Sequence, residues 1–124
     1  MLLTFAKEQF KNKILAGIKI HSIRVDKHKR WKIGMTIHMW LHSPRNVNKH
    51  PFCFCDKHHC LSKQEIWLIP EVKAVFIKRD GEWTIFNDIN TMAFNDGFES
   101  EKGFWAWFNK EMMGVIIHWT DFQY

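Results

Sequence analysis

Hydrophobic and polar residues alternate along most of this chain with the two-residue period that is typical of half-buried β-strands. In residues 35–41, Ile37, Met39 and Leu41 occupy alternate positions, and we expect them to share a buried face. Comparable runs predict further strands, with an interruption near Pro70 in the longest of them, at residues 2–5, 18–25, 65–79, 82–86 and 114–122. Residues 52–55 suit either a short strand or one arm of a hairpin.

Two segments follow the helical period of 3.6 residues instead. Residues 6–16 place Phe10 and Ile14 on one face, and Gly17 follows where a helix is expected to end. In residues 100–110, three aromatic residues fall at positions i, i+3 and i+4, namely Phe104, Trp107 and Phe108. Residues 87–97 show neither period and are predicted to be irregular.

The order of these elements predicts the fold class. Asp80-Gly81 separates two strand-like runs and favours a tight hairpin turn. Most connections are too short for a crossover helix, which argues against parallel βαβ winding. We therefore expect an α+β protein, a compact and mostly antiparallel β-barrel with two short α-helices. A chain of 124 residues suits one domain.

Composition narrows the environment of the protein. No run of 18 apolar residues exists, so no membrane partner is expected, and the N-terminus lacks the long apolar core of a signal peptide. Three Cys do not form a complete disulfide framework. These features predict a cytoplasmic protein with reduced thiols.

Charge and aromatic content point to a polyanionic partner. The net charge is +5, and much of the excess lies in the loop at residues 25–34. Seven Trp and eleven Phe are more than a small core holds easily, so we expect some to line a groove, with a Trp-rich core as the alternative. Basic residues beside an aromatic ring suit a phosphate backbone and a stacked base, although a solvated connector has the same composition.

The segment GIKIHSIR, residues 17–24, concentrates polar groups of chemical interest. Lys19, Ser22 and Arg24 could be a base, a nucleophile and an anion-binding group. In a regular strand, however, Lys19 and Ser22 point to opposite faces. They converge only if Lys19 lies in the turn after Gly17 or if a bulge separates them. Solvated charges on an edge strand are the simpler alternative.

Three stretches together give the chain a resemblance to the ASCH family, a branch of the PUA-like fold. They are LLTFAKEQFKNKILAGIKIHSIR with its G-x-K-x-x-[TS]-x-R pattern, WKIGMTIHMW, and AFNDGFESEKGFWAWF. The resemblance covers nearly the whole chain except about residues 42–65 and implies one ASCH-like domain with a cleft for RNA or a modified nucleoside. Some small bacterial members hydrolyse the amide of 4-acetylcytidine.

The resemblance also implies roles for particular residues. The catalytic Lys and Thr of those hydrolases correspond to Lys19 and Ser22, and their acidic residue corresponds most naturally to Asp96, with Glu99 close by. Ser in place of Thr and Asp in place of Glu are departures from the family pattern. Another is Met35, which replaces the acidic residue that usually follows Gly34.

Three functions are therefore open. The first is a binding module for RNA, another single-stranded nucleic acid or a modified nucleoside, which would use Lys19, Arg24, Lys27, Lys29, Arg30, Trp31 and Lys32. The second is a small amidohydrolase that deacylates 4-acetylcytidine or a related nucleoside through Lys19, Ser22 and Asp96. The third is a protein-interaction module. None of them requires a cofactor.

A cysteine- and histidine-containing insertion lies outside the resemblance, at about residues 42–65. Cys53, Cys55, His58 and Cys60 are ligand types that zinc favours, but their spacing is tighter than that of usual structural zinc sites. We therefore expect no metal, with zinc at these four residues as the alternative.

Overall fold

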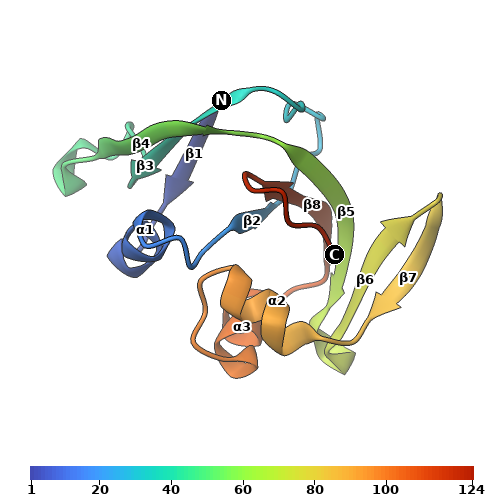
Figure 1. The fold of residues 1–124 in the computed structure, drawn as a ribbon. Coiled ribbons are helices and arrows are strands. Elements are labelled where there is room, and N and C mark those ends of the chain that lie inside the picture. The colour runs from blue at the N-terminus through green and yellow to red at the C-terminus, as the bar shows by residue number, and fades with distance from the viewer.

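The computed structural model describes residues 1–124 and contains two β-sheets and three α-helices. The smaller sheet has the order β1-β3-β4 and consists of β1 (Leu2–Phe5), β3 (Thr36–Leu41) and β4 (Phe52–His59). The larger sheet has the order β2-β8-β5-β6-β7 and consists of β2 (His21–Arg24), β8 (Met112–His118), β5 (Ser62–Ile69), β6 (Ala74–Arg79) and β7 (Glu82–Phe86). The chain passes from one sheet to the other as β4 leads into β5 (Figure 1).

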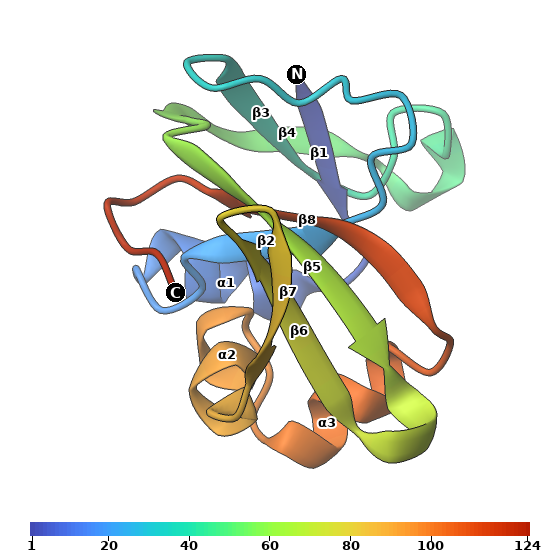
Figure 2. The ribbon, with the colours of Figure 1, turned by 90° about the vertical axis from the view of Figure 1, so that its right-hand side faces the viewer.

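The helices lie near one end of the two sheets. They are α1 (Glu8–Leu15), α2 (Ile89–Asn95) and α3 (Glu101–Trp107), and single 3₁₀ turns occur at η1 (Val47–Lys49) and η2 (Pro70–Val72). Helices α2 and α3 lie next to each other near the start of β2 (Figure 1, Figure 2), where the Ile20 N–H donates to the carbonyl of Asn95 at 2.9 Å. No helix has the length and apolarity needed to cross a membrane.

The expected compact, mostly antiparallel β-barrel with two short helices is wrong. The fold is α+β, but its two sheets stay open and no ladder joins them, because β2 pairs with β8 rather than with a strand of the smaller sheet. Strand β1 pairs in parallel with β3, and the chain between them runs through α1 and β2. Short connections between neighbouring elements do not exclude this parallel pairing, because α1 and β2 together provide the long connection from β1 to β3.

Helix α2 is the additional helix that was not predicted, and it lies within residues 87–97, which were expected to be irregular. Asp88 caps its first turn by accepting a hydrogen bond from the backbone N–H of Thr91 at 3.3 Å. Ile89, Met92 and Ala93 are its buried residues. Their i, i+3, i+4 spacing is helical, but the Asn and Asp residues at both ends of the segment conceal it.

The other predicted elements are confirmed with changed boundaries. Ile37, Met39 and Leu41 are buried in β3 as expected. The hairpin between β6 and β7 turns at Asp80 and Gly81, whose φ angles of 52° and 80° are those of a tight turn that follows the twist of the strands. Strand β2 begins only at His21, three residues later than the expected start at residue 18.

Candidate functional site

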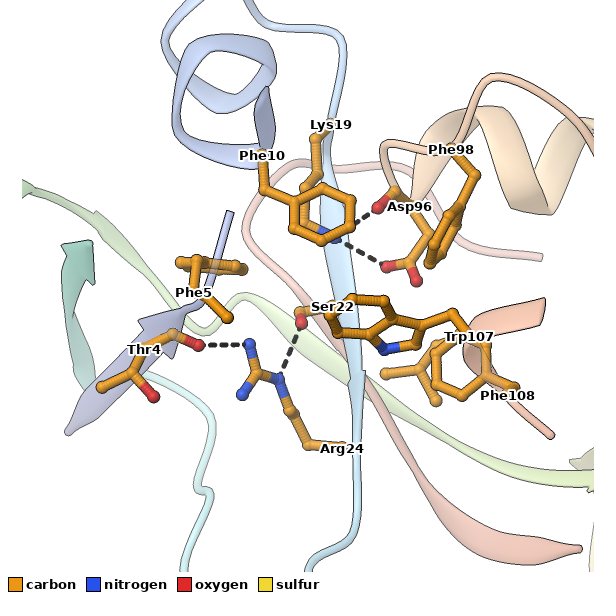
Figure 3. A pocket seen from close by; sticks show the side chains of 12 residues that line it. Thr4, Phe5, Phe10, Lys19, Ser22, Arg24, Asp96, Phe98, Trp107 and Phe108 are labelled. Carbon is orange, nitrogen blue, oxygen red and sulfur yellow. Dashed lines mark hydrogen bonds and ion pairs between the residues drawn. The ribbon is translucent and has the colours of Figure 1, made fainter. Parts of the chain in front are cut away.

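A cleft of about 270 Å³ opens between β1, α1 and β2 on one side and the chain around α2 and α3 on the other. Figure 3 shows its polar residues grouped at the base, with aromatic rings around them. The cleft is lined by Thr4, Phe5, Ala6, Phe10, Lys19, Ser22, Ile23, Arg24, Asp96, Phe98, Trp107 and Phe108.

Lys19 reaches the cleft because it lies before the start of β2. Gly17 has a φ of 75°, which ends α1 and turns the chain, and the backbone N–H of Lys19 then donates to the carbonyl of Lys13 at 3.1 Å. The strand alternation that would separate Lys19 from Ser22 therefore does not apply. Lys19 and Ser22 both reach the cleft because Lys19 lies in the turn after Gly17, which was the first of the two predicted possibilities.

Lys19 and Asp96 form a buried ion pair at the base of the cleft. Lys19 Nζ donates to Asp96 Oδ1 at 2.9 Å and to the backbone carbonyl of Asp96 at 2.5 Å. The side chains of the two residues are 3% and 4% exposed. Burial at this depth is costly for both charges, and the direct pairing compensates part of that cost.

Two aromatic rings complete the surroundings of the ammonium group. Lys19 Nζ lies 5.1 Å from the ring centroid of Phe10 and 5.6 Å from that of Phe5. Burial lowers the pKa of Lys19 from its ordinary value, although the charge of Asp96 opposes this shift. Burial alone would raise the pKa of Asp96, but Lys19 and His21 outweigh it and hold that pKa below its usual range.

Ser22 and Arg24 are neighbours on the same face of β2. Arg24 Nε donates to Ser22 Oγ at 2.9 Å, and another guanidinium nitrogen donates to the carbonyl of Thr4 at 2.7 Å. These bonds hold the guanidinium group between β2 and β1, against the ring of Phe5. Ser22 accepts the bond from Arg24, so its own hydroxyl proton points to no partner in the chain and is available to a ligand.

Aromatic side chains from α1 and from the chain around α3 form much of the wall of the cleft. Phe10 contacts both Phe98 and Trp107 edge to face, each with ring centroids 5.5 Å apart. Trp107, the last residue of α3, lines the cleft, and 45% of its surface is exposed to solvent. Part of the aromatic excess therefore lines a groove, as expected from composition.

Gly97 lets these groups approach one another. A Cβ atom at this position would lie 2.9 Å from Phe10 Cδ1 and 3.0 Å from Lys19 Cδ, and its φ is 94°. Glu99, the other acidic candidate, lies outside the cleft, is exposed and pairs with Lys13 at 2.5 Å. Asp96 is thus the acidic residue that the cleft contains.

Two residues that the sequence did not single out lie behind Asp96. His21 Nδ1 is 3.2 Å from Asp96 Oδ1, and His21 Nε2 is 2.5 Å from the hydroxyl oxygen of Tyr124. His21 lies in the same segment as Lys19, so its polar neighbours were a usable signal. Nothing in the sequence connects it with Tyr124, which is 103 positions away.

The basic loop after β2 is divided between surface and core. Its cationic residues are exposed, and they are Lys27, Lys29, Arg30 and Lys32. Trp31 is only 5% exposed and belongs to the hydrophobic core, so it presents no face on which a base could stack. Lys63 Nζ donates to the carbonyl of Trp31 at 2.5 Å and helps to hold the loop against β5.

The residues proposed as an alternative zinc site, Cys53, Cys55, His58 and Cys60, do not form a metal-binding cluster. Cys53 is exposed on β4, whereas Cys60 is buried after the end of that strand. No three His, Cys, Asp or Glu side chains gather where they could hold a metal ion. The insertion instead forms β4 and the first part of β5. Strand β4 belongs to the smaller sheet and β5 to the larger one, so this segment connects the two sheets.

Comparison with protein-family models, curated proteins and solved structures finds no match to this chain.

Proposed function

We propose that the cleft binds a base or modified nucleoside of a single-stranded nucleic acid, with RNA as the first candidate. The observation that carries this proposal is the combination of an aromatic wall with a cationic base in one cleft. Rings of this kind favour a planar ligand by stacking, and Arg24 and Lys19 favour its electronegative atoms.

The size of the cleft supports a ligand of one nucleoside. Its volume of about 270 Å³ lies just below the range of about 300–1,000 Å³ that is usual for small-molecule sites. One ring system with its sugar at the opening suits this volume better than an extended ligand does.

The polar groups supply complementary hydrogen bonds. Lys19 and His21 both contact Oδ1 of Asp96, which leaves Oδ2 to accept from a ligand N–H. The Ser22 hydroxyl can donate to a ring nitrogen or a carbonyl. An acceptor beside a donor matches the Watson–Crick edge of an amino-substituted base.

The basic loop would extend the contact to phosphates. It follows Arg24 directly, and its exposed cations are Lys27, Lys29, Arg30 and Lys32. The ASCH-like pattern of the sequence supports the same assignment, because its first and third stretches supply all the residues that line the cleft, with Lys19, Ser22 and Asp96 among them.

The test is binding of a fluorescently labelled, mixed-sequence single-stranded RNA at several salt concentrations. Affinity should fall with salt by about 0.7 log units per log unit of salt for each phosphate neutralised. A Lys27→Gln/Lys29→Gln variant should reduce that slope, whereas Arg79→Gln should not, because Arg79 is an exposed cation on β6, three strands away from β2 in the larger sheet. Undetectable or salt-independent binding would contradict the proposal.

Deacylation of such a nucleoside is a second candidate, and one observation favours it. The amine of Lys19, with its pKa lowered by burial, shares the cleft with the hydroxyl of Ser22 and the carboxylate of Asp96. The Ser22 oxygen would attack the acyl carbonyl, Lys19 in its neutral form would take the hydroxyl proton, and Arg24 would stabilise the oxyanion. The C–N bond would then break as the Lys19 ammonium protonates the departing amine, which leaves as the free nucleoside. Water, deprotonated by Lys19, would hydrolyse the acyl-serine to the carboxylic acid and restore the Ser22 hydroxyl.

Chromatography of 4-acetylcytidine after incubation with the protein tests this second candidate. Turnover should give cytidine and acetate, should disappear in Ser22→Ala and Lys19→Met, and should survive in Ser22→Thr. Absence of turnover above a buffer blank would leave the cleft as a binding site alone.

A further inference from the structure

A chain of hydrogen bonds runs from the base of the cleft into the protein interior. It links Asp96 to His21, His21 to Tyr124, and Tyr124 to Asn95, whose Nδ2 donates to the tyrosine hydroxyl at 3.2 Å. His21 is fully buried and is not among the residues that line the cleft, because it points to the face of β2 opposite Ser22.

The donors and acceptors of this chain permit one consistent arrangement. Asp96 as a carboxylate only accepts, so His21 Nδ1 must carry the proton. His21 Nε2 is then an acceptor, because burial lowers the pKa of His21 and keeps the ring neutral. The Tyr124 hydroxyl therefore donates to Nε2 and accepts from Asn95, so that the tyrosine and Asp96 favour the same Nδ1–H tautomer.

Tyr124 is itself held firmly in place. Gln64 Nε2 donates to the backbone carbonyl of Tyr124, and Gln64 Oε1 accepts from the Tyr124 N–H, both at 2.9 Å. The ring packs edge to face against Phe86, Phe122 and His21, with centroids 4.8 to 5.4 Å apart. This clamp directs the hydroxyl toward His21.

We propose that His21 and Tyr124 are positioning residues of the cleft, which orient Asp96 so that its second oxygen faces a bound ligand. The inference rests on the proposed function of the cleft. Lys19 and His21 both contact Oδ1 of Asp96, and two donors on one oxygen restrict rotation of the carboxylate. The fixed tautomer makes that second donor permanent.

The Tyr124→Phe variant removes the hydroxyl and keeps the packed ring. Phe122→Leu is the matched control, because it disturbs the same aromatic cluster and keeps the hydroxyl. Long-range ¹⁵N–¹H spectra of the histidine rings report the tautomer of His21 in each protein, and cytidine binding by calorimetry reports the cleft. His21→Asn adds a rescue variant, since its amide can donate near the position of Nδ1, whereas His21→Gln places its amide near Nε2.

The expected result is an Nδ1–H tautomer in the wild type and in Phe122→Leu, with the ¹⁵N shift of Nε2 at the value of a hydrogen-bonded acceptor. In Tyr124→Phe the Nε2 shift should move to that of an acceptor without a donor, and cytidine affinity should fall at least threefold. His21→Asn should bind cytidine more tightly than His21→Gln. An unchanged Nε2 shift in Tyr124→Phe, or a changed shift with unchanged affinity, would overturn the inference. Failure of the wild type to bind any nucleoside would instead overturn the proposed function, whatever the histidine spectra show.

Discussion

Lys19 and Asp96 lie 77 positions apart in the chain and form an ion pair of 2.9 Å with almost no exposure to solvent. The turn after α1 supplies the lysine, and the end of α2 supplies the aspartate. Two charges buried in this way stabilise a fold little compared with apolar residues of similar volume. Their place at the base of a cleft gives them a functional explanation.

Loss of one member of this pair should be costly. We expect Lys19→Met or Asp96→Asn to lower the free energy of unfolding by about 3–5 kcal/mol, because the remaining group stays buried without its partner. The double variant should lose less than the sum of the two single variants. Denaturant titration measures all three.

The Lys13–Glu99 pair provides the control. Glu99 is largely exposed, so Glu99→Gln should cost less than about 1 kcal/mol. Additive losses at Lys19 and Asp96 would contradict the direct coupling that the structure shows.

Substitution of Gly97 tests how closely the cleft residues pack. Gly97→Ala forces a Cβ against Phe10 and Lys19 and also strains a backbone with positive φ. Gly81→Ala introduces the backbone strain alone, since a Cβ atom there would have no neighbour within 4 Å. We expect Gly97→Ala to destabilise the protein by at least about 1 kcal/mol more than Gly81→Ala and to weaken nucleoside binding. Equal losses in thermal or denaturant unfolding would show that the cleft has room to adjust.

Trp107, rather than Trp31, should stack on a bound base. Trp107→Ala should lower affinity for single-stranded RNA by about 1–3 kcal/mol, which is typical of a lost base–aromatic stack. Trp31→Phe should reduce stability through core packing and leave affinity unchanged in the folded protein. A larger binding loss in Trp31→Phe than in Trp107→Ala would reverse this assignment.

The stability of the protein should depend on pH through His118. Burial lowers the pKa of His118 to about 4 in the folded protein, against an ordinary value of 6.5. The unfolded chain therefore binds the additional proton between these values, and the free energy of unfolding should rise from pH 4 to 6.5 by at most about 3 kcal/mol from this group. His21, whose pKa burial also lowers, acts in the same direction.

Unfolding curves at pH 5 and pH 7 measure this dependence. A His118→Phe variant should show a smaller difference between the two pH values than the wild type does. His28→Gln, at an exposed loop position, serves as the control and should keep the wild-type difference. An unchanged difference in His118→Phe would contradict the prediction.

Local sequence patterns predicted most of the secondary-structure elements and several of the residues that line the cleft. The alternation in residues 35–41 and the Asp80-Gly81 turn each specify an element through nearby residues alone. The parallel pairing of β1 with β3 and the open sheets depend on tertiary contacts, which single-sequence patterns do not contain. The same limit explains why Trp31 was predicted to stack on a base and is instead buried against the core.

For the site, the G-x-K-x-x-[TS]-x-R pattern indicated Lys19, Ser22 and Arg24, and all three line the cleft. Tyr124 could not be found in this way, because its contact with His21 arises only when β8 and the chain after it fold beside β2. Residues that act through such long-range contacts require a structure for their identification.

The most direct test of the proposed cleft is a titration of ¹⁵N-labelled protein with cytidine and with a short single-stranded RNA, followed by amide chemical shifts. Both ligands should perturb the residues around Lys19, Ser22, Asp96 and Trp107, and the RNA should also perturb the basic loop after Arg24. No perturbation at the cleft, or perturbation by RNA confined to the basic loop, would contradict nucleoside binding in the cleft.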